Sequence, residues 1–433
     1  MRAHWVVALA VLTTACGWTR GPAGVASPRF TFGRLQVQFD SGTASARLSW
    51  GAAVAPRFCR YEVQRQGDAA FATVAVLNDV ADTTYVDSEI QGNQLYRYRV
   101  AAHLEDEGGG RVLLTPVASG GVYLFAGSWP TGGGGPFQPT RLAVDSQGCV
   151  YATGIRSGRV ACFTREGEAR GELVYAPEPV ACLAPGALDG PVLAIDSQDN
   201  VYVAYNVPRR SDRPEALWSK FTSTGELAWT KPLGGLFVRH ITIDEGDRVF
   251  VESISQVQQF TTEGEVQQVL QVPALLVASL RVWQGRFAAL IEPMSVMERD
   301  WRAARLVVYE APDRTDPAAV LGRDPLSERD RGDGLLVRPT DFAVEERTGR
   351  AFVVNAGLDR IEVFAVEGFQ TRWGKPGNGP GEFAFEGEVE VLEDIVTGLT
   401  ARRRVRAGGV ACDAAGRILV ADTFNDRIQV FSP

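Results

Sequence analysis

The stretch that decides the fold is residues 408–431, which read GGVACDAAGRILVADTFNDRIQVF. It contains three short apolar runs, at 410–412, 418–420 and 428–431, and polar turns separate them. Asp413 opens the first of these turns. Apolar runs of this length with polar turns between them are typical of β-strands rather than helices. The segment therefore predicts a small antiparallel sheet.

The same arrangement recurs upstream. Phe-Thr-x-x-Gly-Glu occurs at 163–168, 221–226 and 260–265, each time after an apolar run and an aspartate turn. Weaker copies of the unit surround three residues, Trp283, Glu345 and Asp413. Each of the six units reads as four short strands, for example 142–144, 150–153, 159–163 and 169–174. Repeats of four strands predict an all-β chain with a six-bladed β-propeller over residues 119–433.

The ends of this repeat region complement each other. The last unit stops one strand short at residue 433, and an apolar segment at 122–126 precedes the first unit. We expect this early segment to supply the missing outer strand of the last blade. Such pairing closes the ring and protects the surfaces between blades.

A different pattern fills residues 30–118. Seven short alternating runs with Gly, Asn and Asp turns predict a β-sandwich. The segment resembles a fibronectin type III domain in Trp50, in Tyr61, and in the six-residue spacing of Ile90 and Tyr96. That resemblance implies a tyrosine corner, in which the Tyr96 hydroxyl binds a backbone group, and a role as a spacer or adhesion module.

The last unit also carries a family signature. Its Asp413, Asp422, Asn425 and Arg427 resemble the NHL-repeat pattern, and residues 355–364 keep the second half of it. The resemblance implies an NHL-like propeller, and the middle units match only in period.

The N-terminus predicts export. Residues 1–15 resemble a bacterial secretory signal with a positive start and a short apolar run. Cys16 follows as the predicted lipidation site, and 16–29 reads as a flexible tether. Thr13 stands where lipoproteins usually have Leu, so plain secretion is the alternative. We expect a protein of the cell envelope, held at a membrane only by its lipid.

Composition excludes several classes. The chain has 433 residues, is 45% hydrophobic and carries a net charge of -8, and the acidity is spread along it. No internal apolar run is long enough for a transmembrane span, and no basic face indicates nucleic-acid binding. The cysteines lack zinc-site spacing. Cys149 and Cys162 fall on adjacent predicted strands, which leaves open both a disulfide and free buried thiols.

Polar residues at the upper ends of the inner strands are the candidate ligand site. We expect them to line the mouth of the central channel, although ordinary solvated channel residues are the alternative. The set comprises Arg141, Arg239, His240, Ser279, Asp341 and Asn355. A partner-binding loop is predicted at Met294, Met297, Arg299, Trp301 and Arg302, because aromatic and arginine anchors are enriched at interfaces.

These observations favour a binding or scaffold protein, expected as a monomer, that holds a protein, peptide or glycan on the top face of the propeller. No cofactor is expected. The alternative is a hydrolase or lyase similar to lactonase-like propellers, with Ca or Zn on oxygen ligands at the channel mouth. The candidate metal ligands for that activity are Glu252, Glu292, Asp341 and Asn355.

Overall fold

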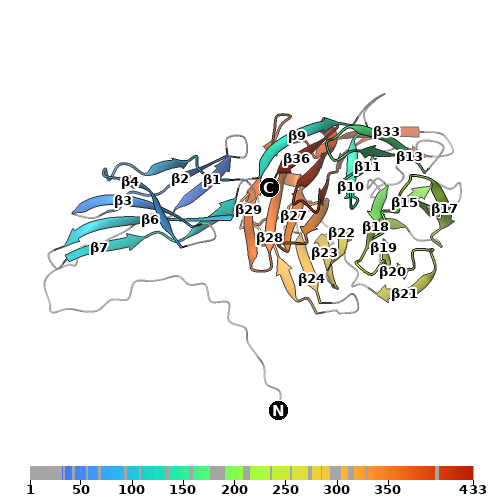
Figure 1. Cartoon of the computed structure of the whole chain (residues 1–433), viewed down its shortest axis with the longest axis horizontal. Coiled ribbons are helices and arrows are strands. Elements are labelled where there is room, and N and C mark those ends of the chain that lie inside the picture. Colours follow the sequence, from blue (N-terminus) through green and yellow to red (C-terminus); the bar gives the residue numbers. More distant parts are fainter. Residues whose placement is uncertain are drawn as a thin grey trace, which may run out of the picture.

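The computed structural model describes most of the chain after residue 31, and it is built almost wholly of β-strands (Figure 1). The described residues are 32, 35–40, 44–54, 57–66, 70–91, 95–106, 109–121, 123–131, 137–155, 159–175, 191–207, 215–234, 237–253, 256–271, 276–283, 285–292, 304–310, 316–326, 330–394 and 399–432. The predicted signal peptide, Cys16 and the tether lie outside them. No helix among the described residues is long and apolar enough to cross a membrane.

Two antiparallel sheets make up the first part of the chain. One sheet contains β1 (Gln36–Asp40), β2 (Ser45–Ser49) and β5 (Thr84–Asp87). The other contains β4 (Ala72–Leu77), β3 (Phe58–Gln66), β6 (Leu95–Asp106) and β7 (Gly109–Leu114), with β8 (Ala118–Gly121) also paired to β6. Their alternating apolar residues meet in one core that includes Trp50, Tyr61 and Tyr98. The Tyr96 hydroxyl accepts a hydrogen bond from the Gln91 amide at 2.9 Å, which confirms the predicted backbone contact.

In the described part of the chain, six four-stranded antiparallel sheets follow, in the arrangement of a β-propeller. The first sheet contains β10 (Pro139–Val144), β11 (Val150–Gly154), β12 (Arg159–Phe163) and β13 (Ala169–Val174). The second contains β14 (Val192–Ile195), β15 (Val201–Val207), β16 (Glu215–Phe221) and β17 (Leu227–Pro232). The third sheet contains β18 (Val238–Ile243), β19 (Val249–Ser253), β20 (Gln256–Phe260) and β21 (Val266–Gln271). The fourth contains β22 (Leu276–Trp283), β23 (Arg286–Glu292), β24 (Arg305–Tyr309) and β25 (Ala319–Leu321).

The fifth sheet is β26 (Asp341–Glu345), β27 (Arg350–Asn355), β28 (Arg360–Ala365) and β29 (Gly368–Trp373). The sixth is β34 (Gly409–Cys412), β35 (Ile418–Asp422), β36 (Arg427–Ser432) and β9 (Leu124–Pro130). Short 3-10 turns, η1 (Ala356–Leu358) and η2 (Thr423–Asn425), join the second and third strands of these two sheets.

The sixth sheet confirms the predicted closure. β9 pairs with β36 antiparallel, with Gly127 opposite Val430 and Phe125 opposite Phe431 (Figure 1). The strand covers residues 124–130 rather than 122–126, so it runs four residues further toward the first sheet than the sequence predicted. Trp129 near its end packs against Phe163 of the first sheet. The two ends of the repeat region therefore meet in one sheet.

Apolar side chains fill the spaces between neighbouring sheets. One cluster joins Trp129, Leu419 and Ile428 of the sixth sheet to Val150 and Phe163 of the first. Comparable clusters lie between the other neighbours, as expected for sheets that pack face to face around a common axis.

The connection between the fifth and sixth sheets contains two smaller sheets of two strands each. β30 (Lys375–Pro376) pairs with β31 (Glu382–Phe383), and β32 (Glu386–Asp394) pairs with β33 (Leu399–Arg406). The second pair is a hairpin in which acidic residues of one strand lie opposite basic residues of the other, with Glu388 opposite Arg404.

The sandwich joins the outer rim of the propeller. β8 ends at Gly121, Tyr123 packs against Phe352 and Trp373 of the fifth sheet, and β9 begins at Leu124. Leu124 also packs against the sandwich core. The sandwich lies beside the outer strands of the propeller (Figure 1).

Candidate functional site

The aspartates between the first two strands of four sheets are structural turn residues. One oxygen of Asp145 accepts hydrogen bonds from the amides of Gln147 and Cys149 at 2.9 and 2.8 Å. Asp196, Asp244 and Asp413 repeat this geometry. Aspartate side chains commonly cap turns in this way. We call this end of the propeller the Asp-turn face.

Serines and aspartates also connect neighbouring turns on the Asp-turn face. The Ser146 amide and hydroxyl donate to the two carboxylate oxygens of Asp199 at 2.8 and 2.7 Å. Ser197 and Asp247 repeat the contact between the second and third sheets at the same distances. Asp199 and Asp247 both have positive φ angles, 63° and 57°. These contacts fix the relative positions of the first three sheets.

The central channel contains a buried polar layer. Asp341 on β26 is 0% exposed and accepts hydrogen bonds from Ser279 Oγ at 2.7 Å and from Arg281 Nη2 at 3.0 Å. Its other oxygen accepts from the Val410 amide at 3.2 Å. One carboxylate thus connects the fourth, fifth and sixth sheets, and its charge is balanced by Arg281.

Arg141 and His240 belong to the same layer. Arg141 is 5% exposed and donates to the carbonyl oxygens of Thr140 and Gly408 at 3.2 and 3.4 Å. His240 is 1% exposed, and burial lowers its pKa well below the usual value. The positive charges of Arg141 and Arg281 lower the pKa of His240 further. The imidazole is therefore neutral at pH 7.

The sequence places these residues at an open channel mouth, and the structure instead buries four of them. Arg141, His240, Ser279 and Asp341 are each at most 5% exposed. The reason is that the residues in the layer bind one another or nearby carbonyl groups across neighbouring sheets. Arg239 is partly buried and contributes to the electrostatics of His240.

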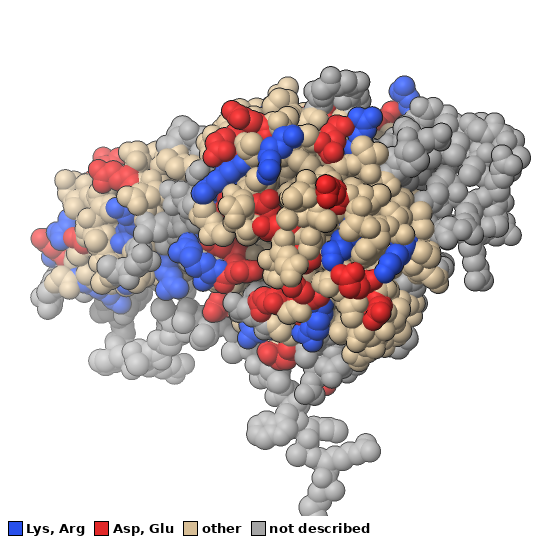
Figure 2. All heavy atoms as spheres, turned by 45° about the vertical axis from the view of Figure 1, so that its right-hand side comes forward, with Lys and Arg blue, Asp and Glu red and all other residues tan. Residues whose placement is uncertain are grey.

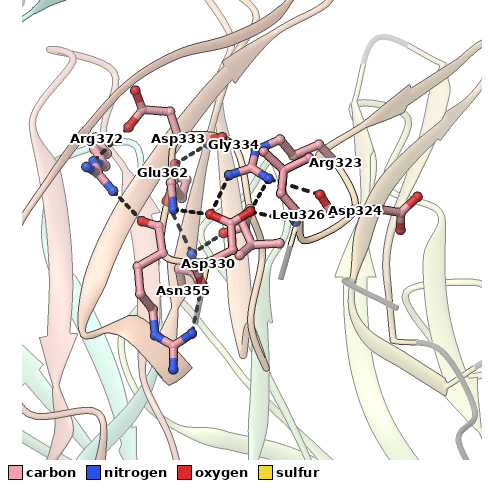
Figure 3. Close-up of polar contacts among 12 residues, drawn as sticks. Arg323, Asp324, Leu326, Asp330, Asp333, Gly334, Asn355, Glu362 and Arg372 are labelled. Atoms are coloured by element: carbon pink, nitrogen blue, oxygen red, sulfur yellow. Dashed lines mark hydrogen bonds and ion pairs between the residues drawn. The ribbon is translucent and has the colours of Figure 1, made fainter. Parts of the chain in front are cut away.

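Asn355 lies outside this layer. Its amide donates to the Leu335 carbonyl at 2.7 Å and its oxygen accepts from the Val337 amide at 2.8 Å (Figure 3). These bonds attach the connection before β26 to the end of β27. Asn355 is 0% exposed, and the backbone carbonyl of Leu335 and the backbone amide of Val337 occupy the two ends of its side-chain amide.

A charged pair supports the same connection. Glu362 is 0% exposed and accepts hydrogen bonds from Arg360 Nε at 2.6 Å and from the Gly334 amide at 3.3 Å. Arg360 also donates to the carbonyls of Arg331 and Gly332, both at 2.8 Å. Burial raises the pKa of Glu362, and it lowers the pKa of Arg360. The pair thus clamps residues 331–334 onto β28.

Asp330 completes this clamp. It forms an ion pair with Arg323 at 2.5 Å and accepts from the Leu326 and Gly332 amides, both at 2.8 Å (Figure 3). The Arg323 hydrogen bond is the main cause that lowers the pKa of Asp330. We call Arg323, Asp330, Asn355, Arg360 and Glu362 the clamp.

Two of the predicted metal ligands have separate partners. Asp341 is bonded to Ser279 and Arg281, whereas Asn355 is bonded to the loop before β26. Glu252 is buried on β19, and the side chain of Glu292 lies outside the described residues. Within the described part of the chain, no three His, Cys, Asp or Glu side chains are placed to hold a metal ion. The predicted loop residues Met294, Met297, Arg299, Trp301 and Arg302 also lie outside it.

Charged side chains of the β32–β33 hairpin form an exposed surface. Arg402 and Glu388 lie 4.0 Å apart, with side chains 81% and 65% exposed. Glu386 pairs with both Arg404 and Arg406. Apolar residues on the other face, Val389 and Val405, pack with Ile155 and Phe424. The hairpin is therefore seated on the first and sixth sheets and turns its charges outward.

A cavity of about 210 Å³ lies in the central channel, between the buried polar layer around Asp341 and the Asp-turn face. The residues just before the aspartate turns line it, and all six inner strands contribute. The lining includes Leu142, Val144, Leu193, Ile195, Ile241, Ile243, Arg281, Val282, Val344, Glu346, Val410 and Cys412. Sequence reasoning missed Arg281, which lies in a degenerate repeat copy without the aspartate that marks the inner strand elsewhere.

The described cysteines are all free. The Cys149 sulfur accepts a hydrogen bond from Arg170 at 2.9 Å, and burial raises the pKa of Cys162 to about 12. The structure therefore favours buried thiols over the Cys149–Cys162 disulfide. Cys182 lies outside the described residues.

Comparisons with known proteins identify a fold likeness only. No family model matches the chain, and no curated protein matches it. Virginiamycin B lyase from Staphylococcus aureus is similar at 12% identity and a TM-score of 0.40, over 71% of this chain and 98% of the lyase. An auxiliary nutrient binding protein from Bacteroides ovatus gives 10% identity and a TM-score of 0.43, over 94% and 98%. A glucose dehydrogenase gives 12% and 0.41, over 71% and 99%. Likenesses at these values assign no activity to the chain.

Proposed function

We propose that the chain is an exported binding protein of the cell envelope, with a six-bladed NHL-like propeller carried on a fibronectin type III-like sandwich. Six four-stranded sheets support the blade number, and the Tyr96–Gln91 hydrogen bond supports the sandwich type. The signal and Cys16 in the sequence support export with a lipid anchor.

The binding surface in this proposal is the face opposite the Asp-turn face, which we call the loop face. A protein, peptide or glycan is the proposed partner. The observation that carries the proposal is the β32–β33 hairpin, an addition to the sixth sheet that is seated by Val389 and Val405 and exposes charges of both signs. Additions to repeat proteins are tolerated where they present a binding surface.

Rigidity of the same face supports the proposal. The clamp fixes the connection between the fourth and fifth sheets through buried hydrogen bonds. A preformed surface loses little conformational entropy on binding, which favours affinity. Lys and Arg are interspersed with Asp and Glu over the surface drawn in Figure 2, which suits a protein or glycan better than a polyanion.

Site-specific photocrosslinking tests this proposal. A crosslinker at Arg402 on the hairpin should capture a defined envelope partner from intact cells, since this side chain is 81% exposed. The matched control is Gln198, an exposed residue on the Asp-turn face. Equal capture from both positions, or none from Arg402, would contradict the proposal.

A further inference from the structure

An open groove of about 700 Å³ lies at one end of the sandwich. Its lining comes from the start of β3 and from the segment around the end of β4. Phe58 in this lining lies opposite Leu104 near the end of β6, whereas β8, which leads to the propeller, pairs with the start of β6. The groove is therefore at the end of the sandwich that lies away from the propeller.

Apolar and acidic side chains share the surface of this groove. Val76 and Val80 are 50% and 38% exposed. Asp79 and Asp82 are also exposed, and within the described residues no positive side chain forms an ion pair with either. The Ala81 amide donates to Asp79 Oδ1 at 2.9 Å, which holds this carboxylate in place. Such a surface suits an apolar group that stands next to a positive charge.

The chain enters the sandwich beside the groove. Phe32 stacks on Tyr61 with a centroid distance of 5.8 Å and an interplanar angle of 5°. Phe58 of the groove packs against the same Tyr61 ring at 4.5 Å. The Tyr61 hydroxyl donates to the Val80 carbonyl at 3.2 Å. Tyr61 thus connects Phe32 to both parts of the groove wall.

The residues before Phe32 match the groove in chemistry. Residues 16–31, which precede the first described residue, contain two positive side chains, Arg20 and Arg29, and no acidic one. Phe30 follows Arg29 directly, so a ring and a guanidinium are neighbours in the chain. An extended chain advances about 3.4 Å per residue, so Phe30 and Arg29 start within about 7 and 10 Å of Phe32. Both side chains are therefore within reach of the groove.

Two other occupants fit this groove less well. A membrane surface brings anionic headgroups, which the carboxylates of the groove repel. A second chain or a partner protein loses translational and rotational freedom on binding, whereas a segment of the same chain is held beside the groove at high effective concentration. These arguments favour the N-terminal segment of the chain itself.

We infer that the segment before Phe32 docks in this groove. Phe30 lies among the apolar side chains of the groove, and Arg29 pairs with its two carboxylates. The docked segment holds Cys16, the predicted lipidation site, on the side of the sandwich away from the propeller. The inference goes beyond the proposed loop-face partner and does not depend on it.

Photocrosslinking from position 30 of the full chain tests this inference. Phe30→p-benzoylphenylalanine keeps an aromatic ring at this position and links to whatever lies against it. We expect linkage within one chain to residue 58 or to residues 76–82, shown by a monomer band on a denaturing gel and by mass spectrometry of linked peptides. Linkage to a lipid, to a second copy or to another protein, or absence of linkage to the groove, would each overturn the inference.

Two sets of charge variants test the pairing of Arg29. Asp79→Asn combined with Asp82→Asn should lower the internal linkage about two- to fivefold, as expected for exposed ion pairs. Glu89→Gln is the matched control, because Glu89 is an exposed acid beyond the other end of β5, and it should leave the linkage unchanged. Equal linkage in the two variants would overturn the pairing. Capture at Arg402 should be the same in both, so the two proposals fail separately.

Discussion

Glu362 is the residue on which the clamp depends most. Its charge is 0% exposed and is neutralised by Arg360, whose side chain is 9% exposed. Glu362→Gln keeps the size of the side chain but leaves the buried guanidinium without a counter-charge. We therefore expect the free energy of unfolding of the propeller to fall by about 3 kcal/mol, measured by urea denaturation.

An exposed ion pair provides the comparison for Glu362→Gln. Glu388 and Arg402 are 65% and 81% exposed and 4.0 Å apart, so solvent screens their attraction. Glu388→Gln should change the free energy of unfolding by less than about 0.5 kcal/mol. Equal effects of the two substitutions would mean that the Glu362–Arg360 pair is not buried as described.

Single residues were predictable from sequence only where their role is local. Asp145 caps its own turn, and a turn signature is visible in any one repeat. Asp341 binds Ser279 and Arg281 from the preceding sheet and Val410 from the next one, and the sequence does not show which strands meet. For the same reason Asn355 was assigned to the channel, although its partners are Leu335 and Val337 in the connection before β26 and Glu362 on β28.

Among the elements, β9 packs the last sheet against the first through an aromatic contact. Trp129 is 9% exposed and stacks on Phe163 at a centroid distance of 6.1 Å. Gly167 has a φ of 91°, and a side chain there would collide with the Trp129 indole. Trp129→Ala should lower the free energy of unfolding by about 3 to 5 kcal/mol in urea denaturation, because a large buried ring is removed.

The neighbouring residue is the control for Trp129→Ala. Ser128 is exposed on the other face of β9, so Ser128→Ala should be within about 0.5 kcal/mol of the wild type. A Trp129→Ala variant as stable as Ser128→Ala would show that β9 does not contact the first sheet.

The connection between β25 and β26 should loosen in acid. The pKa of Asp330 is lowered from its ordinary value of 3.8, mainly by Arg323, so the folded connection binds protons less readily than the unfolded chain. Its contribution to stability is therefore present above that value and is lost as the pH falls below it. Asp330→Ala should remove the contribution at neutral pH.

Hydrogen exchange at pH 7 measures the loss of this contribution in Asp330→Ala. The Leu326 and Gly332 amides, which both donate to Asp330, should exchange faster in Asp330→Ala than in the wild type. Amides of β27 should keep their protection. Unchanged exchange at Leu326 and Gly332 would contradict a role for Asp330 in holding the connection.

Strand positions were largely predictable because apolar alternation is a local property. The expected strands 159–163 and 169–174 coincide with β12 and β13. β9 was placed too early, since the apolar run 122–126 includes Tyr123, which packs in the core of the fifth sheet instead of pairing in the sixth. Hydrophobicity indicates burial but does not distinguish the two neighbouring cores.

The ring of sheets depends on the pairing of β9 with β36, which lie at opposite ends of the repeat region. Closure through β9 and β36 gives the inner strands a common channel, and the channel divides into the polar layer and the cavity. The sequence predicted closure from the missing strand. It did not predict the cavity, because its walls come from six strands whose relative heights are set only in the assembled ring.

A cross-strand disulfide measures that closure directly. Gly127 lies opposite Val430, and a side chain at position 127 meets open space. The Gly127→Cys/Val430→Cys variant should form a disulfide under oxidising conditions, detected by mass spectrometry of linked peptides. Ser128→Cys/Val430→Cys should not, because a shift of one residue turns the side chain to the other face of the sheet. Efficient linkage of the second pair and not of the first would contradict the closed ring.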